Sequence, residues 1–214
     1  MKICFFFSHK KNFLLLFLYL ALIAISFLLS SNYLKNNKVN VNWWMFNGAL
    51  SNYCYDKYEY LHFNDQLDKF LKGEIPQLLC ETVKPNKSYI KDPKIKEKAD
   101  FYISNAKYAV NSIAMIWKFT GIKKIAIDYL LIIFFLVSIS FFFFIINYFS
   151  NPVIAFVSTY FSLEFLLQFL SDFRDFSKTP FILGLLFVVC LFFKQKKNIL
   201  ILILYLVLIA FIIG

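Results

Sequence analysis

The chain has 214 residues, of which 60% are hydrophobic and only 17% are charged, and its mean hydropathy is +0.63. Soluble domains are about half apolar and about a quarter charged, so this composition excludes an ordinary soluble protein and indicates a membrane protein. The net charge of +10 comes from lysines spread along the chain, which disfavours nucleic-acid binding and favours contact with membrane lipids.

The first apolar run covers Phe13 to Ser30 and follows a start that carries Lys2, Lys10 and Lys11. A cleaved signal peptide would require a small-x-small site after this run, and no clear one follows. We therefore expect residues 1–30 to form a cytoplasmic start and an uncleaved membrane-spanning helix, oriented by the positive-inside rule.

A polar segment of residues 31–124 comes next, with 15 lysines, nine acidic residues and three glycines. So few glycines predict a folded segment, unlike a flexible Gly/Ser linker. Residues Trp43 to Phe46 are expected to be an interfacial anchor, because Trp prefers the headgroup zone. Tyr58 to Leu71 has the apolar spacing of an amphipathic helix, and Ala106 to Phe119 is expected to be a helix that lies flat on the membrane.

Two of the four cysteines, Cys54 and Cys80, lie in this polar segment, and the chain has no CxxC motif. A disulfide between them is chemically allowed if the segment lies outside the cytoplasm, but the spacing alone does not fix the pairing. The sequence contains no zinc-ligand spacing, P-loop, nucleophile elbow or dinucleotide-binding fingerprint.

Four more apolar runs fill residues 125–214, which we expect to form a membrane domain. Their predicted spans are Ile125 to Phe149, Pro152 to Leu170, Phe181 to Phe193 and Asn198 to Gly214. Alternation from a cytoplasmic N-terminus places the basic loop of Lys194 to Lys197 in the cytoplasm and the long polar segment outside. The expected fold is an all-α membrane protein with about five transmembrane helices and a large, partly helical extracytoplasmic loop between the first and second.

The fourth span is short, since 13 residues rise only about 20 Å against a hydrocarbon core of about 30 Å. A re-entrant segment would fit this length. Alternatively, the helix begins near Asp175 with Pro180 in its first turns, where proline is tolerated.

Four charged residues, Asp172, Arg174, Asp175 and Lys178, lie within seven positions between the third and fourth spans. A loop there lies at the membrane surface, where a lipid-linked phosphate would also lie. Arg can bind phosphate oxygens in a bidentate manner and Lys adds a point charge. The carboxylates could orient the Arg, bind a sugar hydroxyl or hold a divalent metal ion. The alternative is a solvated loop whose charges pair with one another.

Residues Arg174 to Phe181 read RDFSKTPF, which resembles the R-D-[YF]-x-K-x-P-F stretch of bacterial integral-membrane glycosyltransferases of the GT-C type. The layout, with one span followed by a large external loop and closely spaced spans, is similar to theirs. The resemblance implies sugar transfer from a polyprenyl-phosphate donor on the outer side of the bacterial inner membrane. GT-C proteins usually have eight or more spans, whereas five are expected here and the last ends with the chain. The chain is therefore expected to be the N-terminal portion of such an enzyme, or one that has lost the rest.

The catalytic carboxylate of this family usually lies in the first external loop, where it acts on the acceptor hydroxyl as a general base. The loop offers Asp56, Glu59, Asp65 and Asp68. Asp56 is the first choice because it follows the expected Trp anchor and lies among aromatic residues, and Asp65 is the second. No family motif fixes the choice, and each acid could simply lie on the exposed face of an amphipathic helix.

Glu164 lies inside the third span, about two turns from its outer end. A carboxylate within a span is costly and usually faces the protein interior, a cavity or a partner. We assign it a supporting role in the site, while a proton relay or a structural hydrogen bond are alternatives. Two other functions stay open: a transporter subunit, and a non-catalytic scaffold whose external loop binds a partner.

Overall fold

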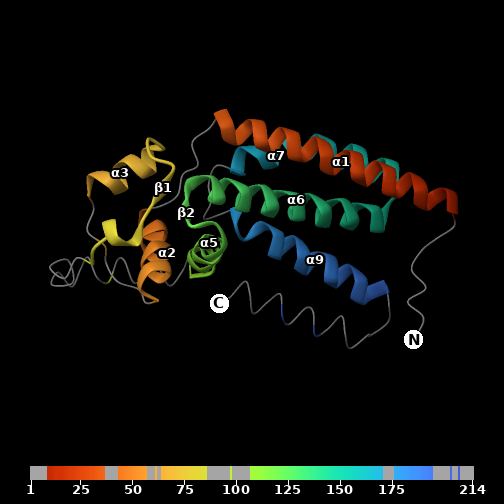
Figure 1. Cartoon of the computed structure of the whole chain (residues 1–214). Helices are drawn as coiled ribbons and strands as arrows, with labels where there is room; N and C mark the ends of the chain where they lie inside the picture. The colour runs from red at the N-terminus through yellow and green to blue at the C-terminus, as the bar shows by residue number, and fades with distance from the viewer. Residues whose placement is uncertain are drawn as a thin grey trace. The chain divides into compact units, whose positions relative to one another are not determined.

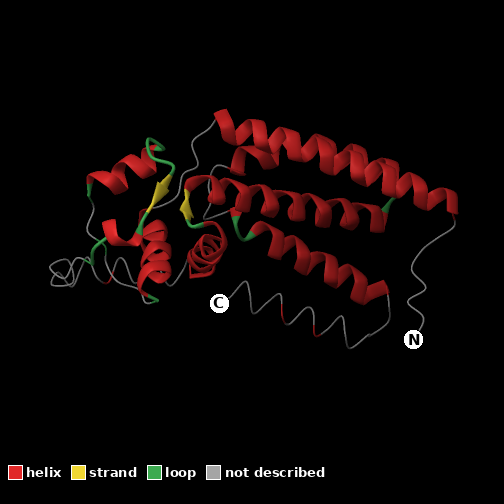
Figure 2. Ribbon diagram, viewed as in Figure 1, coloured by secondary structure: helices red, strands yellow, loops and turns green. Residues whose placement is uncertain are grey.

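The computed structural model describes residues 9–36, 43–56, 61, 64–85, 97, 107–170, 176–194, 203 and 207. Seven α-helices and one short pair of strands lie in these ranges (Figures 1 and 2). The chain divides into two compact units. Unit 1 is mainly Met1–Lys38, Ile132–Ser171 and Lys178–Ile213, and unit 2 is mainly Val39–Leu131 and Asp172–Ser177.

Three helices in the described part of the chain are long and apolar enough to cross a membrane: α1 (His9–Asn36), α6 (Lys124–Phe149) and α7 (Pro152–Leu170). A fourth apolar helix, α9 (Thr179–Lys194), is shorter. The protein is therefore a mainly helical membrane protein, as its composition predicted. The fifth expected span lies outside the described residues except at two positions, so the number of five spans stays a prediction.

The turn between α6 and α7 follows from two residues. Asn151 Oδ1 accepts hydrogen bonds from the backbone N–H groups of Val153 and Ile154, at 3.0 and 3.1 Å. Asn151 thus caps α7, and Pro152 occupies its first position, where a missing N–H costs nothing. The predicted spans Ile125 to Phe149 and Pro152 to Leu170 are therefore joined by a tight turn. Helix α9 also has a proline near its start, since it begins at Thr179 and Pro180 lies in its first turn. Its 16 residues make it longer than the 13-residue span that was expected.

Polar and aromatic contacts join the helices of unit 1. Helices α1 and α7 pack side by side (Figure 1). The hydroxyl groups of Tyr19 on α1 and Ser140 on α6 share a hydrogen bond of 2.8 Å, and the Tyr19 ring packs on Phe143 and Phe144. Ser140 Oγ also donates to the Leu136 carbonyl at 2.7 Å. These bonds satisfy hydroxyl groups that hydrocarbon could not solvate.

Helices α6 and α9 pack closely at one glycine. The Phe141 ring on α6 lies 5.8 Å from the Phe187 ring on α9. A Cβ added to Gly184 would lie 3.0 Å from Phe141 Cε2, closer than ordinary van der Waals contact. The absence of a side chain at Gly184 therefore lets the aromatic ring approach the α9 backbone, as small residues do in membrane helix pairs.

Unit 2 consists of short elements. They are α2 (Trp43–Tyr55), α3 (Asp65–Lys72), β1 (Gln77–Leu78), the 3₁₀ turn η1 (Cys80–Thr82), α5 (Lys107–Thr120) and β2 (Ile122–Lys123). The two strands are antiparallel, with Gln77 opposite Lys123 and Leu78 opposite Ile122. This pairing joins the segment after α3 to the start of α6.

Helices α2 and α5 pack together and bury an aromatic core. The Phe46 ring on α2 lies 5.5 Å from the Trp117 ring on α5 and 5.6 Å from Phe70 on α3. The expected anchor is wrong for Met45 and Phe46, which are each only 1% exposed, because both side chains are buried inside unit 2, Phe46 against Trp117 of α5. The side chains of Trp43 and Trp44 lie outside the described part.

Helix α5 is confirmed, and its position flat on the membrane stays a prediction. Its regularly spaced apolar residues face the core of unit 2 rather than a membrane surface; the fully buried ones are Ala109, Val110, Ile113, Ala114 and Trp117. Periodicity identifies an apolar face without saying what covers it, and here α2 covers it.

Helix α3 is shorter than the sequence predicted. Asn64 Oδ1 accepts from the Leu67 N–H at 2.9 Å and caps the start, and Gly73, with φ of 79°, ends the helix. The expected start at Tyr58 is wrong, because Leu61 instead forms an isolated β-bridge with Pro85. The Leu61 N–H donates to Asn47 Oδ1 at 3.3 Å.

Replacing Gly184 by Leu should destabilise unit 1 by about 1–3 kcal/mol, because the new side chain overlaps the Phe141 ring. Thermal unfolding in detergent or lipid would measure this loss. The matched control is the double variant Gly184→Leu with Phe141→Ala, in which the removed ring makes room. If Gly184→Leu costs as much stability in the Phe141→Ala background as in the original protein, this packing contact is misassigned.

Candidate functional site

Asp56 lies at the end of α2 in an uncommon backbone conformation. Its φ is 52°, and it is the only residue other than glycine with positive φ among those that the structure describes. Its N–H donates to the Asn52 carbonyl at 3.1 Å, and its side chain is exposed. Left-handed geometry ends many helices, and Asp tolerates it better than most residues. The carboxylate is thus presented to solvent at a fixed point of the backbone.

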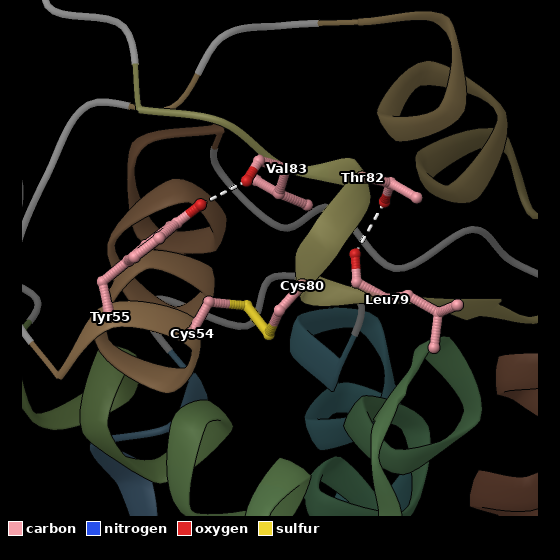
Figure 3. The surroundings of a disulfide bond; sticks show 6 residues. All are labelled: Cys54, Tyr55, Leu79, Cys80, Thr82 and Val83. Atoms are coloured by element: carbon pink, nitrogen blue, oxygen red, sulfur yellow. Dashed lines mark hydrogen bonds between the residues drawn. A yellow bond between two sulfur atoms is a disulfide. The ribbon is translucent and has the colours of Figure 1, made fainter.

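A disulfide and a hydrogen bond fix the end of α2 beside Asp56 (Figure 3). Cys54 is bonded to Cys80, with a Cα–Cα distance of 5.5 Å, so the pairing that the sequence left open is confirmed. The Tyr55 hydroxyl donates to the Val83 carbonyl. Both contacts attach the last turn of α2 to the segment around η1, which restricts the motion of Asp56.

Further hydrogen bonds order the segment around η1. Thr82 Oγ1 donates to the Leu79 carbonyl at 2.7 Å, as Figure 3 also shows. The Thr82 carbonyl accepts from Asn64 Nδ2 at 2.8 Å. The cap of α3 and the end of α2 therefore both hold this segment in place.

Asp65, the second candidate base, has an ordinary structural role. It occupies the first turn of α3 and forms an ion pair of 2.8 Å with Lys69, one turn along the helix. Hydrogen bonding to Asp65 raises the pKa of the Lys69 ammonium group. Asp68 pairs with Lys72 in the same way. Both pairs are exposed, and such pairs contribute little to stability.

The expected phosphate-binding residues are described only in part. Lys178 is half-buried, and its carbonyl accepts from the N–H groups of Phe181 and Ile182 at 3.1 Å, so it forms the start of α9. Asp172, Arg174 and Asp175 lie outside the described residues. Their grouping with Lys178 around a phosphate stays a prediction.

Glu164 lies on the exposed side of α7. Within the described part of the chain, no hydrogen bond or ion pair involves its carboxyl group. The structure brings it together with none of the other candidate residues that it describes, and its supporting role stays a prediction.

The described residues include no group of three or more His, Cys, Asp or Glu side chains that could hold a metal ion. A shallow pocket of about 650 Å³ lies in unit 1 between the start of α1 and the α6–α7 turn. Asn12, Asn147 and Asn151 supply amide groups to it, and none of the candidate residues lines it.

The residues that hold Asp56 in place, above all Tyr55 and Asn64, were not predicted from the sequence. Asn64 had a local signature, because an Asn followed by acidic residues is typical of a helix start. Tyr55 had none, since its partner Val83 is 28 positions away and only the folded chain brings them together.

Comparison with protein-family models, with curated proteins and with solved structures finds no match to this chain.

Replacing Cys54 and Cys80 by Ser should lower the stability of unit 2 by about 3 kcal/mol, because the open chain regains the entropy of a loop of this length. Chemical denaturation followed by tryptophan fluorescence would measure this, because all three tryptophans of the chain, the buried Trp117 among them, lie in unit 2. Cys190→Ser is the control, since Cys190 is a free cysteine. Equal stability of both variants would contradict a structural role for the disulfide.

Asp56→Ala should cost about 1–2 kcal/mol, because Ala lacks the tolerance of Asp for positive φ. Asp56→Gly should be at least as stable as the original protein, since glycine adopts this conformation freely. The same denaturation experiment compares them. Equal destabilisation of the Ala and Gly variants would mean that the carboxylate, rather than the backbone geometry, stabilises this turn.

Proposed function

We propose that the chain is a GT-C-like glycosyltransferase, or part of one, that transfers a sugar from a polyprenyl-phosphate donor on the extracytoplasmic side of the membrane. The observation that carries the proposal is Asp56, an exposed carboxylate held at positive φ beside a disulfide. Uncommon backbone geometry is concentrated at functional sites, so it supports a role for this residue.

The disulfide supports the side of the membrane. Disulfides persist in oxidising compartments such as the periplasm and are rare in the cytosol. Cys54 and Cys80 both belong to unit 2, which follows α1 in the chain. An extracytoplasmic unit 2 agrees with a cytoplasmic N-terminus and with Lys194 to Lys197 in the cytoplasm, so the cysteines and the basic residues favour the same orientation.

The proposed chemistry assigns one task to each group. The Asp56 carboxylate accepts the proton of the acceptor hydroxyl as that oxygen attacks the anomeric carbon of the sugar. Arg174 and Lys178 bind the phosphate of the leaving polyprenyl phosphate and stabilise its charge. Asp172 and Asp175 orient Arg174. Asp65 is a weaker candidate for the base, because Lys69 pairs with it.

Asp56→Asn and Arg174→Ala should each reduce sugar transfer by about 100-fold or more, the usual contribution of a general base or a charge-stabilising group. The assay uses membranes that contain the full chain, labelled polyprenyl-phosphate sugars and extraction of the glycosylated product. Asp68→Asn is the matched control, because Asp68 is an acid of the same unit that is engaged in an ion pair.

Transfer at the original rate by both variants would refute the assigned site. Intact membrane insertion and an intact Cys54–Cys80 disulfide in each variant would exclude misfolding as the cause of any loss.

A second candidate function is a non-catalytic domain that binds a partner. Met115 and Phe119 favour it, since they lie one turn apart on α5 and are 63% and 79% exposed. In this second function a partner covers the two side chains and removes their apolar surface from water. The transfer assay separates the two functions, because a binding domain has no need of the Asp56 carboxylate.

A further inference from the structure

The exposed apolar side chains of unit 2 are gathered at the corner where α5 leads into α6. Among the residues of this unit that the structure describes, the large apolar side chains that are exposed are Leu79, Met115, Phe119, Ile125 and Tyr129. Four of them lie in the last turns of α5 or the first turns of α6. Leu79 comes one position after the Leu78–Ile122 pair, so the strand register places it opposite Gly121. The exposed residues of α3 and of the first half of α5 are polar by contrast.

This corner is attached to the start of a helix that is long and apolar enough to cross a membrane. The Trp117 indole N–H on α5 donates to the Lys123 carbonyl at 3.1 Å, and Lys124 Nζ donates to the Leu71 carbonyl at 3.2 Å. Unit 2 includes both α5 and the first turns of α6, as far as Leu131. In Figure 1, α5 is seen nearly end-on, whereas the first turns of α6 run across the view. Where α6 enters the bilayer, α5 therefore runs beside the bilayer surface.

The short distance to α6 determines what the apolar side chains can reach. Phe119 precedes Lys124 by five positions, so its backbone lies at most about 17 Å from the start of α6. Lys118 and Lys123 are exposed at the same corner, and their ammonium groups are complementary to the phosphate groups of lipid. Apolar side chains this close to a bilayer enter its interfacial zone, because the transfer removes their surface from water.

We propose that Met115 and Phe119 of α5, together with Leu79, insert into the interfacial zone of the bilayer beside α6. Lipid is the occupant because the span that begins at Lys124 brings this corner to the membrane, and because Ile125 and Tyr129 continue the exposed apolar surface onto α6 itself. The larger apolar face of α5 stays buried in unit 2. The contact with lipid is made by a second, smaller strip at the end of the helix.

Quenching of single fluorescent labels tests this contact in the full chain, inserted in phospholipid vesicles. The background is Cys4→Ser with Cys190→Ser, which leaves the Cys54–Cys80 disulfide in place. Labels on Met115→Cys and Phe119→Cys should be quenched by nitroxides near the top of the lipid acyl chains and protected from iodide in the water. A label on Gln66→Cys, an exposed polar position of α3, is the matched control and should show the opposite pattern.

Substitution of Phe119 tests the chemistry, with the label on Met115→Cys as the readout. Phe119→Ser should shift the equilibrium between inserted and uninserted forms about tenfold toward the uninserted form, because the burial of one phenyl ring is lost. Phe119→Leu should keep this equilibrium within about threefold of the original, because leucine also buries a large apolar side chain. Unchanged lipid quenching in Phe119→Ser would overturn the proposal, and so would iodide quenching at Met115 as strong as at Gln66.

A photoreactive residue at Phe119, in the full chain in its own cell membrane, separates lipid from protein as the occupant. A cross-link to phospholipid would support the proposal. A cross-link to protein, whether of another chain or of this one, would overturn it, and another chain would favour the second candidate function. An intact Cys54–Cys80 disulfide in each variant verifies that unit 2 is folded.

Discussion

The packing of Trp117 against Phe46 is the contact on which unit 2 depends. Trp117 is fully buried, its ring meets Phe46 edge to face at 5.5 Å, and its indole N–H donates to the Lys123 carbonyl at 3.1 Å. Buried indole groups usually combine a large apolar area with one hydrogen bond in this way. Because Lys123 directly precedes α6, one side chain both joins α2 to α5 and fixes the backbone from which a membrane span begins. Lys124 adds to this by donating to the Leu71 carbonyl at 3.2 Å.

Local patterns in the sequence were sufficient for part of this structure. The long apolar runs predicted α1, α6 and α7, because a membrane span needs only length and hydrophobicity. The Asn151-Pro152 turn was predictable from the conformational limits of those two residues. Contacts between distant residues were not predictable in this way. The sequence could not show that α2 covers the apolar face of α5, or that Leu61 pairs with Pro85, since these depend on the folded arrangement.

For the candidate site, too, local patterns were predictable from the sequence and contacts between distant residues were not. The sequence supplied Asp56 as a residue type in a suitable segment, but its positive φ and the nearby bond from Tyr55 to Val83 are visible only in the fold. For Asp65, the sequence left open an exposed position on an amphipathic helix, and in the structure Asp65 lies exposed on α3 and pairs with Lys69. Arg174 rests on the RDFSKTPF resemblance, a local feature whose first two residues, Arg174 and Asp175, lie outside the described residues.

The cap at Asn151 has a consequence for biogenesis. No polar loop separates α6 from α7, so the two helices form a helical hairpin when they meet the insertion machinery. The short turn at Asn151 is the one segment between the two helices. The Asn151 side chain already satisfies the N–H groups of Val153 and Ile154 within the hairpin, so the turn needs little from water or from later segments. The two helices can therefore enter the bilayer as one unit during synthesis, before α9 has left the ribosome.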